Sequence, residues 1–338
     1  MALQWCEGWD AYASQAELQN SGKYKVIAVS SSWQFFTTAG KFGGKAVAGQ
    51  VAGYPVSFRC DVNIPSGSTI YVGGWWRSTS AAVAPGNLNW ICPNGNLLIS
   101  ANGSGYLSLY NNTTTAIATG STFLLDGYHW VEASILLNGA SSSITAYVDG
   151  ILQFSGSYSL SNFPAQTVTQ IFIGTGYGST TNYLDDFVVW DSTGTTFNTF
   201  PIGARRIGLM NPSGPGSTTQ FAPSTGANWQ CASQPFSGTA YVSDAGTGNS
   251  DTYAMSALPY TPLQNINAVV VNTQANNPAA DGAHSVSNKL KSGSTTVSGS
   301  LRQLTATNVV YFDAFPKDSS GNAWTLANLN AAQAGIGD

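Results

Sequence analysis

The turns between short apolar runs constrain this chain more than any other feature of its sequence. Asn-Gly at residues 138–139 and Asp-Gly at residues 149–150 each separate two runs rich in aromatic and β-branched residues. Such dipeptides favour the tight turns of antiparallel hairpins, and such runs favour strands. The chain is therefore predicted to be all-β. Strands are expected at residues 71–76, 87–92, 97–100, 106–110, 129–137, 144–148, 151–154, 170–173 and 183–190, and then at 205–209, 251–255, 267–271, 295–301 and 309–315.

Helix signals are few, so we expect very little helix. One candidate is residues 11–18, with Asp10 as the N-terminal cap. The other is residues 326–334, with Thr325 as the cap and Gly335 as the stop.

A polar loop at residues 192–196 predicts a domain boundary, because it follows the last strong strand of the first half. A length of 338 residues fits about two domains. We predict one β-sandwich at residues 1–197 and a second at residues 198–338. Within the second, the Gly-, Pro- and Ser-rich residues 211–217 are expected to form a loop.

The low charge of the chain excludes two classes of partner. It has 12 Lys and Arg, 16 Asp and Glu, and 8% charged residues in all, against about 25% in an average soluble protein. So few cations give no basic surface for nucleic acid or for an anionic membrane. No apolar run approaches the length of about 18 residues that a spanning helix needs, and the first residues do not read as a secretory signal. We expect neither nucleic acid binding nor membrane insertion.

The four cysteines are scattered and form no Cys-x-x-Cys pair. We predict buried, reduced thiols made in a reducing compartment. The alternative is a disulfide between Cys60 and Cys92. The four are Cys6, Cys60, Cys92 and Cys231.

The stretch from residue 127 to residue 191 carries a resemblance to a known fold family. A strand with Trp130 is followed by Val-Asp-Gly at 148–150, Ile-Gly at 173–174 and Leu-Asp-Asp-Phe at 184–187. This order resembles the second half of a concanavalin A-like, laminin G-like jelly roll. The resemblance implies that the first domain is a concanavalin A-like sandwich.

The whole chain is similar to virion structural proteins of tailed bacteriophages. The motifs that carry this are Gly-Trp-Asp at 8–10, Phe-Gly-Gly-Lys at 42–45, the Asp-Asp strand, Gly-Ala-Arg at 203–205, and the final segment from Trp324 to Ile336. The resemblance implies a protein on the particle exterior, as a capsid decoration or as a tail, baseplate or fibre component.

Three tryptophans are the candidate ligand-binding residues. Trp75, Trp76 and Trp90 lie on neighbouring expected strands. A glycan site needs an exposed aromatic face on which a sugar ring can stack. The alternative is that these rings belong to the core. Because neighbouring residues on a strand alternate, either Trp75 or Trp76 must point away from the core.

The acidic residues near positions 10 and 185 are expected to form structural hydrogen bonds or, alternatively, a metal site. Asp185 and Asp186 are adjacent on an expected strand, so their side chains should point to opposite faces and should not act as a pair. One of them is expected to bind backbone near Asp10. No cofactor is expected; the alternative is a structural Ca²⁺ held by Glu7, Asp10 and Asp185, because calcium prefers oxygen ligands.

The sequence lacks the residues of a glycoside hydrolase. Such enzymes need two carboxylates at a fixed separation, and none of Glu7, Glu17 and Glu132 has a carboxylate two or four positions along. His129 and His284 are the two histidines, no Gly-x-Ser-x-Gly elbow occurs, and His129 reads as a strand residue. We expect no catalytic residues and no enzymatic activity.

These observations favour a non-enzymatic virion protein on the exterior of a phage particle, assembled in the host cytoplasm. Its expected partners are other virion proteins and further copies of itself, with a trimer favoured, since charges are depleted from interface cores. The alternative is a carbohydrate-binding receptor-recognition protein for bacterial surface glycans. A secreted lectin-like protein is the third hypothesis, which the missing secretory signal disfavours.

Overall fold

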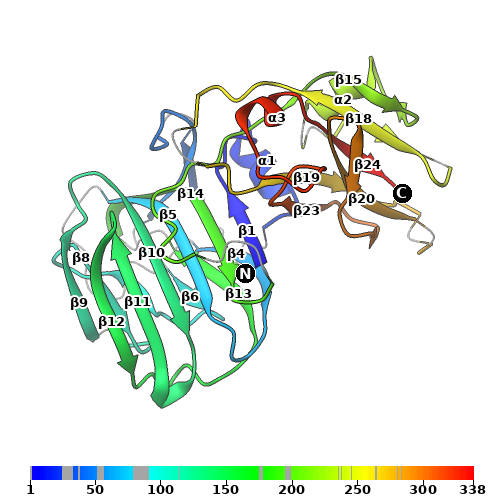
Figure 1. The fold of residues 1–338 in the computed structure, drawn as a ribbon. Coiled ribbons are helices and arrows are strands. Elements are labelled where there is room, and N and C mark those ends of the chain that lie inside the picture. The colour runs from blue at the N-terminus through cyan, green and yellow to red at the C-terminus, as the bar shows by residue number, and fades with distance from the viewer. Residues whose placement is uncertain are drawn as a thin grey trace. The chain divides into compact units, whose positions relative to one another are not determined.

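The chain folds into two compact units, which the computed structural model in Figure 1 shows. Unit 1 consists of Met1–Gln15 and Tyr24–Ile207, and unit 2 of Ala16–Lys23 and Gly208–Asp338. Unit 1 thus runs on past the predicted boundary at residue 197. The structure describes residues 2–24, 33–36, 39–51, 57–78, 91–113, 115–174, 178–194, 199–234, 236, 238–244, 246–262, 265–279, 281–282 and 284–338.

Unit 1 is built on one large antiparallel sheet, in which β12, β11, β10 and β5 lie side by side (Figure 1). The order is β12-β11-β10-β5-β14-β3-β2, and β1 also pairs with β14. The strands are β1 (Ala2–Glu7), β2 (Trp33–Phe36), β3 (Ala46–Val51), β5 (Ile70–Ser78), β10 (Tyr128–Leu136), β11 (Ser142–Val148), β12 (Ile151–Tyr158) and β14 (Gly178–Asp191).

Two smaller sheets complete unit 1. One has the order β4-β13-β6 and the other β7-β8-β9. The strands are β4 (Ser57–Ile64), β13 (Val168–Gly174), β6 (Cys92–Pro93), β7 (Ile99–Ala101), β8 (Tyr106–Tyr110) and β9 (Ala116–Phe123), and a short 3₁₀ turn, η1 (Gly139–Ser141), follows β10.

Alternate side chains of β5 point into the core of unit 1. Val72 and Ile70 are fully buried and lie opposite Ala133 and Ile135 of β10, which are equally buried. Inward residues of the smaller sheets, such as Ile171, are buried as well. Two layers that bury alternate residues against each other form a sandwich.

One of the two turns that define the sequence pattern is confirmed as a tight hairpin. Asp149 and Gly150 have φ values of 50° and 80° between β11 and β12. A two-residue turn of this kind needs left-handed backbone at both positions, which Asp and Gly accept. The other turn is longer than expected, because Gly139 begins η1 and is one of several residues between β10 and β11.

Unit 2 is a second antiparallel assembly. Its main sheet has the order β15-β18-β24-β20-β21, with β22 beside β20, and two strand pairs are β16-β17 and β19-β23. The elements are α1 (Gln15–Asn20), whose last five residues lie in unit 2, β15 (Pro212–Thr219), β16 (Ala222–Pro223), α2 (Asn228–Ala232), β17 (Val242–Ser243), β18 (Ser250–Met255), β19 (Val269–Ala275), β20 (Ser285–Ser292), β21 (Thr295–Ser298), β22 (Arg302–Gln303), β23 (Val309–Phe315), α3 (Leu326–Asn330) and β24 (Gln333–Gly337).

A compact apolar cluster forms the core of unit 2. It includes Leu290 of β20, Phe315 of β23 and Trp324, whose indole Nε1 donates to the carbonyl of Phe315 at 2.8 Å. Thr325 caps α3 as expected, because its hydroxyl accepts from the N–H of Asn328. The expected helix to residue 334 is too long, since β24 begins at residue 333.

Two expectations for the start of unit 2 are wrong. The expected loop at 211–217 is strand β15, which pairs with β18 and lies at the edge of the sheet. Prolines cannot donate to a ladder but are tolerated on an edge strand, and Pro212 and Pro215 lie on this one. The expected strand at 205–209 is irregular, because its first residues bind across unit 1.

The all-β fold with very little helix is confirmed. The three α-helices of the described residues have 6, 5 and 5 residues. No helix in this part of the chain is long and apolar enough to span a bilayer.

Candidate functional site

The candidate site lies on the outer face of the large sheet in unit 1, opposite the core. On β5 it presents Tyr71, Trp75 and Arg77, and on β10 the register places Trp130 opposite Trp75. The two indoles meet edge to face at 5.7 Å. Gly73 lies beneath Trp130, and a Cβ there would come within 2.7 Å of the indole. A glycine is therefore needed at this position.

Residues 200–207, called the strap below, cross this outer face and are bound to it first at Glu132 of β10. The N–H groups of Ile202 and Gly203 donate to the Glu132 carboxylate at 2.8 and 3.1 Å. The Glu132 side chain is fully buried, and burial raises its pKa, while the backbone donors and Arg205 act in the opposite direction.

The next two strands bind the rest of the strap. Trp75 of β5 donates from Nε1 to the carbonyl of Arg205 at 2.8 Å. Asp186 of β14 accepts from the N–H of Ile207 at 2.8 Å. Together with Glu132, these side chains bind the strap to three neighbouring strands, β10, β5 and β14.

Aromatic contacts hold the start of the strap. The ring of Phe200 lies 5.3 Å from Tyr71 of β5 and 5.8 Å from Tyr147 of β11. The strap therefore covers the part of the outer face that is richest in aromatic rings.

The structure places two of the three candidate tryptophans, Trp75 and Trp76, on opposite faces of β5. Trp76 is 2% exposed and faces the core, and Trp75 is 9% exposed on the outer face. The alternation predicted for this pair is therefore observed, but the outward ring meets the strap rather than solvent. Trp90 lies outside the described residues. Their ligand-binding role stays a prediction.

Asp185 and Asp186 do not alternate as expected. The register with β5 shifts between Asp185 and Val188, and Asp186 has a φ of 50°. This bulge turns both carboxyl groups into buried positions, with 5% and 3% exposure. The expectation that they point to opposite faces is wrong, because a bulge breaks the alternation of a strand.

Burial dominates the electrostatics of this pair. Desolvation raises the pKa of Asp185 to about 7, and desolvation together with repulsion from Asp185 raises the pKa of Asp186. Asp185 accepts from the N–H groups of Lys41 and Asp186, each at 2.8 Å. Oδ1 of Asp186 binds the strap, whereas its buried Oδ2 has no hydrogen-bond partner.

The loop around residues 40–45 joins the pair to Asp10. Asp10 accepts from the N–H of Lys45 at 2.7 Å, and the Lys45 ammonium donates to the carbonyl of Asp10 at 3.0 Å. A Cβ on Gly44 would lie 2.4 Å from the Asp10 carboxylate, which explains a glycine there. Asp185 and Asp10 thus bind backbone of the same loop, as expected for a structural lock.

Glu7 has its own set of donors. It accepts from the N–H of Trp9 at 3.0 Å and from the hydroxyls of Tyr12 and Tyr24 at 3.1 and 2.8 Å. Within the described ranges, no group of three or more His, Cys, Asp or Glu residues is arranged to hold a metal ion. The calcium site of Glu7, Asp10 and Asp185 stays a prediction.

Cations and aromatic rings gather where the loop meets the strap. The ammonium of Lys41 lies 4.5 Å from the ring centre of Trp75, and Phe42 meets Trp75 edge to face at 5.8 Å. The exposed guanidinium of Arg206 lies 4.7 Å from the ring of Phe42, which is 43% exposed.

Arg77 extends this cluster along β5. Its exposed guanidinium lies 5.9 Å from the ring of Tyr128 and 5.4 Å from that of Tyr183. The hydroxyl of Tyr128 donates to the carbonyl of Ala39 at 2.6 Å, which joins the rings to the loop. We call this surface the cation–aromatic patch. It consists of Lys41, Phe42, Arg77, Tyr128, Tyr183 and Arg206.

The cation–aromatic patch was not predicted from the sequence. Its signal is the placing of rare cations: Arg77 follows two tryptophans and Arg206 belongs to an Arg-Arg pair in a chain with 12 basic residues. These residues come together only because the strap crosses the sheet, and the local sequence pattern does not predict that crossing.

His129 is held on β10 between two carboxylates, as expected for a strand residue. Its two ring nitrogens lie 2.6 Å from Asp126 and 2.6 Å from Asp149. The hydrogen bond from His129 is the main cause that lowers the pKa of Asp126. Because both ring nitrogens are hydrogen-bonded to carboxylates, the imidazole has a structural role.

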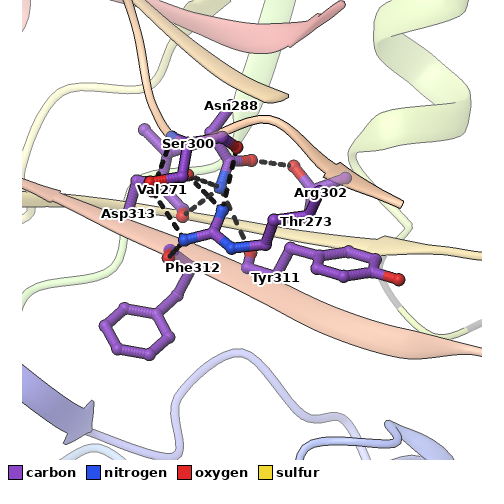
Figure 2. A network of polar contacts seen from close by, with 8 residues as sticks. All are labelled: Val271, Thr273, Asn288, Ser300, Arg302, Tyr311, Phe312 and Asp313. Carbon is purple, nitrogen blue, oxygen red and sulfur yellow. Dashed lines mark hydrogen bonds and ion pairs between the residues drawn. The ribbon is translucent and has the colours of Figure 1, made fainter. Parts of the chain in front are cut away.

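A buried polar network in unit 2 is likewise structural (Figure 2). Arg302 donates through both terminal nitrogens to Asp313 at 2.8 Å, and Asn288 donates to the same carboxylate at 2.8 Å. Thr273 donates to the Asn288 carbonyl oxygen. These hydrogen bonds join β19, β20, β22 and β23.

No protein-family model and no curated protein matches the chain, but solved structures do. The endo-β-1,4-glucuronan lyase of the fungus Trichoderma reesei is 15% identical, with a TM-score of 0.33, over 51% of this chain and 91% of the lyase. A carbohydrate esterase of the Shiga toxin-encoding bacteriophage phi24B is 18% identical, with a TM-score of 0.37, over 53% of this chain and 94% of the esterase. The metal-free lectin I-B4 of Griffonia simplicifolia is 9% identical, with a TM-score of 0.31, over 50% of this chain and 92% of the lectin.

The expectation that the chain is not an enzyme is corrected. A glucuronan lyase, an alginate lyase and a carbohydrate esterase are among the similar structures. The missing pair of carboxylates concerns glycoside hydrolysis alone, and one fold can support many chemistries. At these identities the likeness concerns the fold. The chain is an all-β protein of antiparallel sheets, and lectins and carbohydrate-active enzymes are among the structures that it is similar to.

Proposed function

We propose that this protein binds carbohydrate through the cation–aromatic patch of unit 1, as a receptor-recognition protein on the exterior of a tailed-phage particle. The observation that carries the proposal is the exposed ring of Phe42, held between Trp75 and the guanidinium of Arg206. Sugar rings stack on exposed aromatic faces, and fixed polar groups beside them bind the hydroxyls.

The patch is pre-organised for such binding. The strap places Arg206, and the loop that carries Phe42 is fixed where the N–H of Lys41 donates to Asp185. A surface that is ordered before binding loses little conformational entropy when the ligand arrives.

The place on a virion is supported by the order of motifs along the chain and by its low charge. In this proposal the protein is assembled with other virion proteins in the host cytoplasm and forms a homo-oligomer, with a trimer favoured. A surface of small polar residues suits close packing between copies, because charged groups are depleted from interface cores.

The proposal is tested by binding of the purified full chain to an array of bacterial surface glycans. Phe42→Ala should weaken binding about fivefold, because a stacked ring contributes on the order of 1 kcal/mol. Phe123→Ala is the matched control, since Phe123 is also 43% exposed but lies on β9, outside the patch. Equal binding by both variants, or a blank array, would contradict the proposal. Antibody labelling of phage particles tests the virion assignment separately.

A further inference from the structure

The inference concerns how copies of the chain meet, and it rests on the homo-oligomer of the proposed function. We propose that a patch on unit 1 of one copy docks on a patch of opposite charge on unit 2 of a second copy. The first, called the hairpin patch, consists of Asp126, His129, Asp149, Ile151 and Leu152. The second, called the lysine patch, consists of Lys289, Lys291 and Leu301.

Two exposed aliphatic side chains form the centre of the hairpin patch. Ile151 and Leu152 begin β12 directly after the tight turn at residues 149–150, and they are 56% and 50% exposed. Among the residues of unit 1 that the structure describes, they are the two most exposed large hydrophobic side chains. Exposed apolar side chains that lie together mark contact surfaces, whereas scattered single ones do not.

Carboxylates border this apolar centre. Asp149 belongs to the turn itself and lies 2.6 Å from one ring nitrogen of His129, whose other ring nitrogen lies 2.6 Å from Asp126. The side chains of Asp126 and Asp149 are 66% and 40% exposed. One imidazole can balance at most one of the two carboxylates, so the border of the hairpin patch keeps a net negative charge.

The lysine patch carries the opposite charge. Lys289 and Lys291 lie two residues apart on β20, so they share one face of the strand about 7 Å apart. Their ammonium groups donate to the hydroxyls of Ser298 and Ser217 at 3.0 and 2.7 Å. Among the described residues, no carboxylate lies within ion-pair distance of either lysine. Because an ammonium has three donors, each lysine can also bind a carboxylate of another molecule.

Leu301 supplies the apolar part of the lysine patch. It is 66% exposed, and the segment that carries it runs beside β20, as the strand pairs on either side of it show. The next residue, Arg302, binds the buried Asp313, and so does Asn288 of β20 (Figure 2). Because neighbouring residues on an extended chain alternate, Leu301 and Lys289 both point away from this buried network and toward the same side.

The two patches are complementary in kind. Each combines exposed aliphatic side chains with charge of one sign, and the two signs are opposite. Protein interfaces place apolar contacts at the centre and polar groups at the rim, and complementary charges select the partner. Because both patches belong to one chain, every second copy brings the matching surface. Such a head-to-tail contact closes into a ring when the rotation between copies permits it.

The test measures the mass of the full chain by light scattering over a range of concentrations at low salt. Leu152→Lys places a cation opposite the lysine patch, and Leu301→Asp places an acid opposite the hairpin patch. Each should weaken self-association at least about tenfold, because like charges in an interface repel. Self-association of the parent should also weaken as salt rises. The matched controls are Ile117→Lys and Tyr241→Asp, at residues that are 45% and 58% exposed and lie outside both patches.

A mixture of the two variants separates this contact from any other. The Leu301→Asp chain keeps an intact hairpin patch, and the Leu152→Lys chain keeps an intact lysine patch. Equal amounts should therefore form a one-to-one complex under conditions in which neither variant associates alone. An interface in which one patch meets its own copy would not be restored in this way.

The outcomes separate this inference from the proposed function. An oligomer of the same mass in the parent and in both variants would overturn the inference and leave the homo-oligomer in place. Variants that stay apart when they are mixed would do the same. A parent that is a monomer at every concentration would overturn both the inference and the homo-oligomer. Carbohydrate binding is decided by the glycan array alone.

Discussion

Asp185 accepts a hydrogen bond from the N–H of its own neighbour, Asp186, at 2.8 Å, and both carboxyl groups are buried. Two adjacent acids on a strand would ordinarily point apart. The bulge between Asp185 and Val188 brings both of them into the protein, where Asp186 also binds the strap. This pair makes unit 1 sensitive to pH.

We expect unit 1 to become more stable as the pH falls from 8 to 5. The folded pKa of Asp185 is raised to about 7 and that of Asp186 is also raised, whereas an unfolded Asp titrates near pH about 3.9. The folded state therefore holds more protons in this window, so stability is lost as pH rises through 7. The difference should be about 2 kcal/mol, measured by thermal unfolding followed by near-ultraviolet circular dichroism. Asp186→Asn should flatten the profile, and an unchanged slope in that variant would contradict the assignment.

The Arg302–Asp313 pair in unit 2 predicts the opposite response to acid (Figure 2). Although burial alone would raise it, the hydrogen bonds from Arg302 and its neighbours lower the pKa of Asp313. A lowered folded pKa contributes stability above pH about 3.9 that is lost as the pH falls through the folded value. Below pH 4 we expect unit 2 to unfold more readily. Urea unfolding at pH 6 and pH 3 measures this loss.

Arg302→Lys should destabilise unit 2 by about 1–2 kcal/mol at neutral pH, because an ammonium cannot make the two parallel bonds to Asp313. Lys317→Gln, at an exposed position, serves as the surface control. A stability equal to that of the parent would mean that the pair adds nothing to folding.

Glu132→Gln should loosen the strap. The amide would leave one of the two N–H donors of Ile202 and Gly203 facing another donor at a fully buried position. A buried unsatisfied donor costs about 1–3 kcal/mol. Limited proteolysis should cut within residues 200–207 faster than in the parent. The control is Asp61→Asn, a change at an exposed carboxylate, and equal cutting rates in the two variants would argue against the strap.

All four cysteines should be free when the protein is denatured without reductant and alkylated. Cys60 on β4 and Cys92 on β6 pair with opposite sides of β13. Strands separated by a third strand lie about 10 Å apart, beyond the limit of about 7 Å for a disulfide. Burial also raises the pKa of Cys92 to about 12, so it should react slowly in the native protein. A bridged peptide in the mass spectrum would contradict this register.

Local pattern predicted most of the strands of unit 1 but not what covers them. The run at 71–76 and the Asp-Gly turn at 149–150 are local signals, and β5 and the β11–β12 hairpin follow them. The strap is different, because Arg205 binds Trp75, which is 130 residues away in sequence. The local pattern of residues 205–209 predicts a strand, because it does not show the distant residues that bind them.

Two other misses have separate physical causes. The prolines of β15 predicted a loop, because proline is excluded from the middle of a sheet. Only the order of the sheet shows that β15 is an edge strand, where proline is tolerated. The bulge at Asp186 needs left-handed backbone at a residue that is not glycine, and no dipeptide signal marks it. Rare cations such as Arg77 and Arg206 were visible in the sequence, but their common patch depends on both the strap and the loop at 40–45.

Helix α1 has a consequence for how the protein is made. The carbonyl of its neighbour Ser21 accepts a hydrogen bond from the side chain of Gln274, which lies 253 residues later. Both residues belong to unit 2, whereas the chain returns to unit 1 at Tyr24. At synthesis rates of about 5–20 residues per second, this segment leaves the ribosome about 13–50 s before its partner exists. During that time the rest of unit 1, from Tyr24 to Ile207, is synthesised and can fold. Unit 2 therefore cannot be completed from the C-terminal part of the chain alone, since it also needs residues 16–23, which are made before most of unit 1.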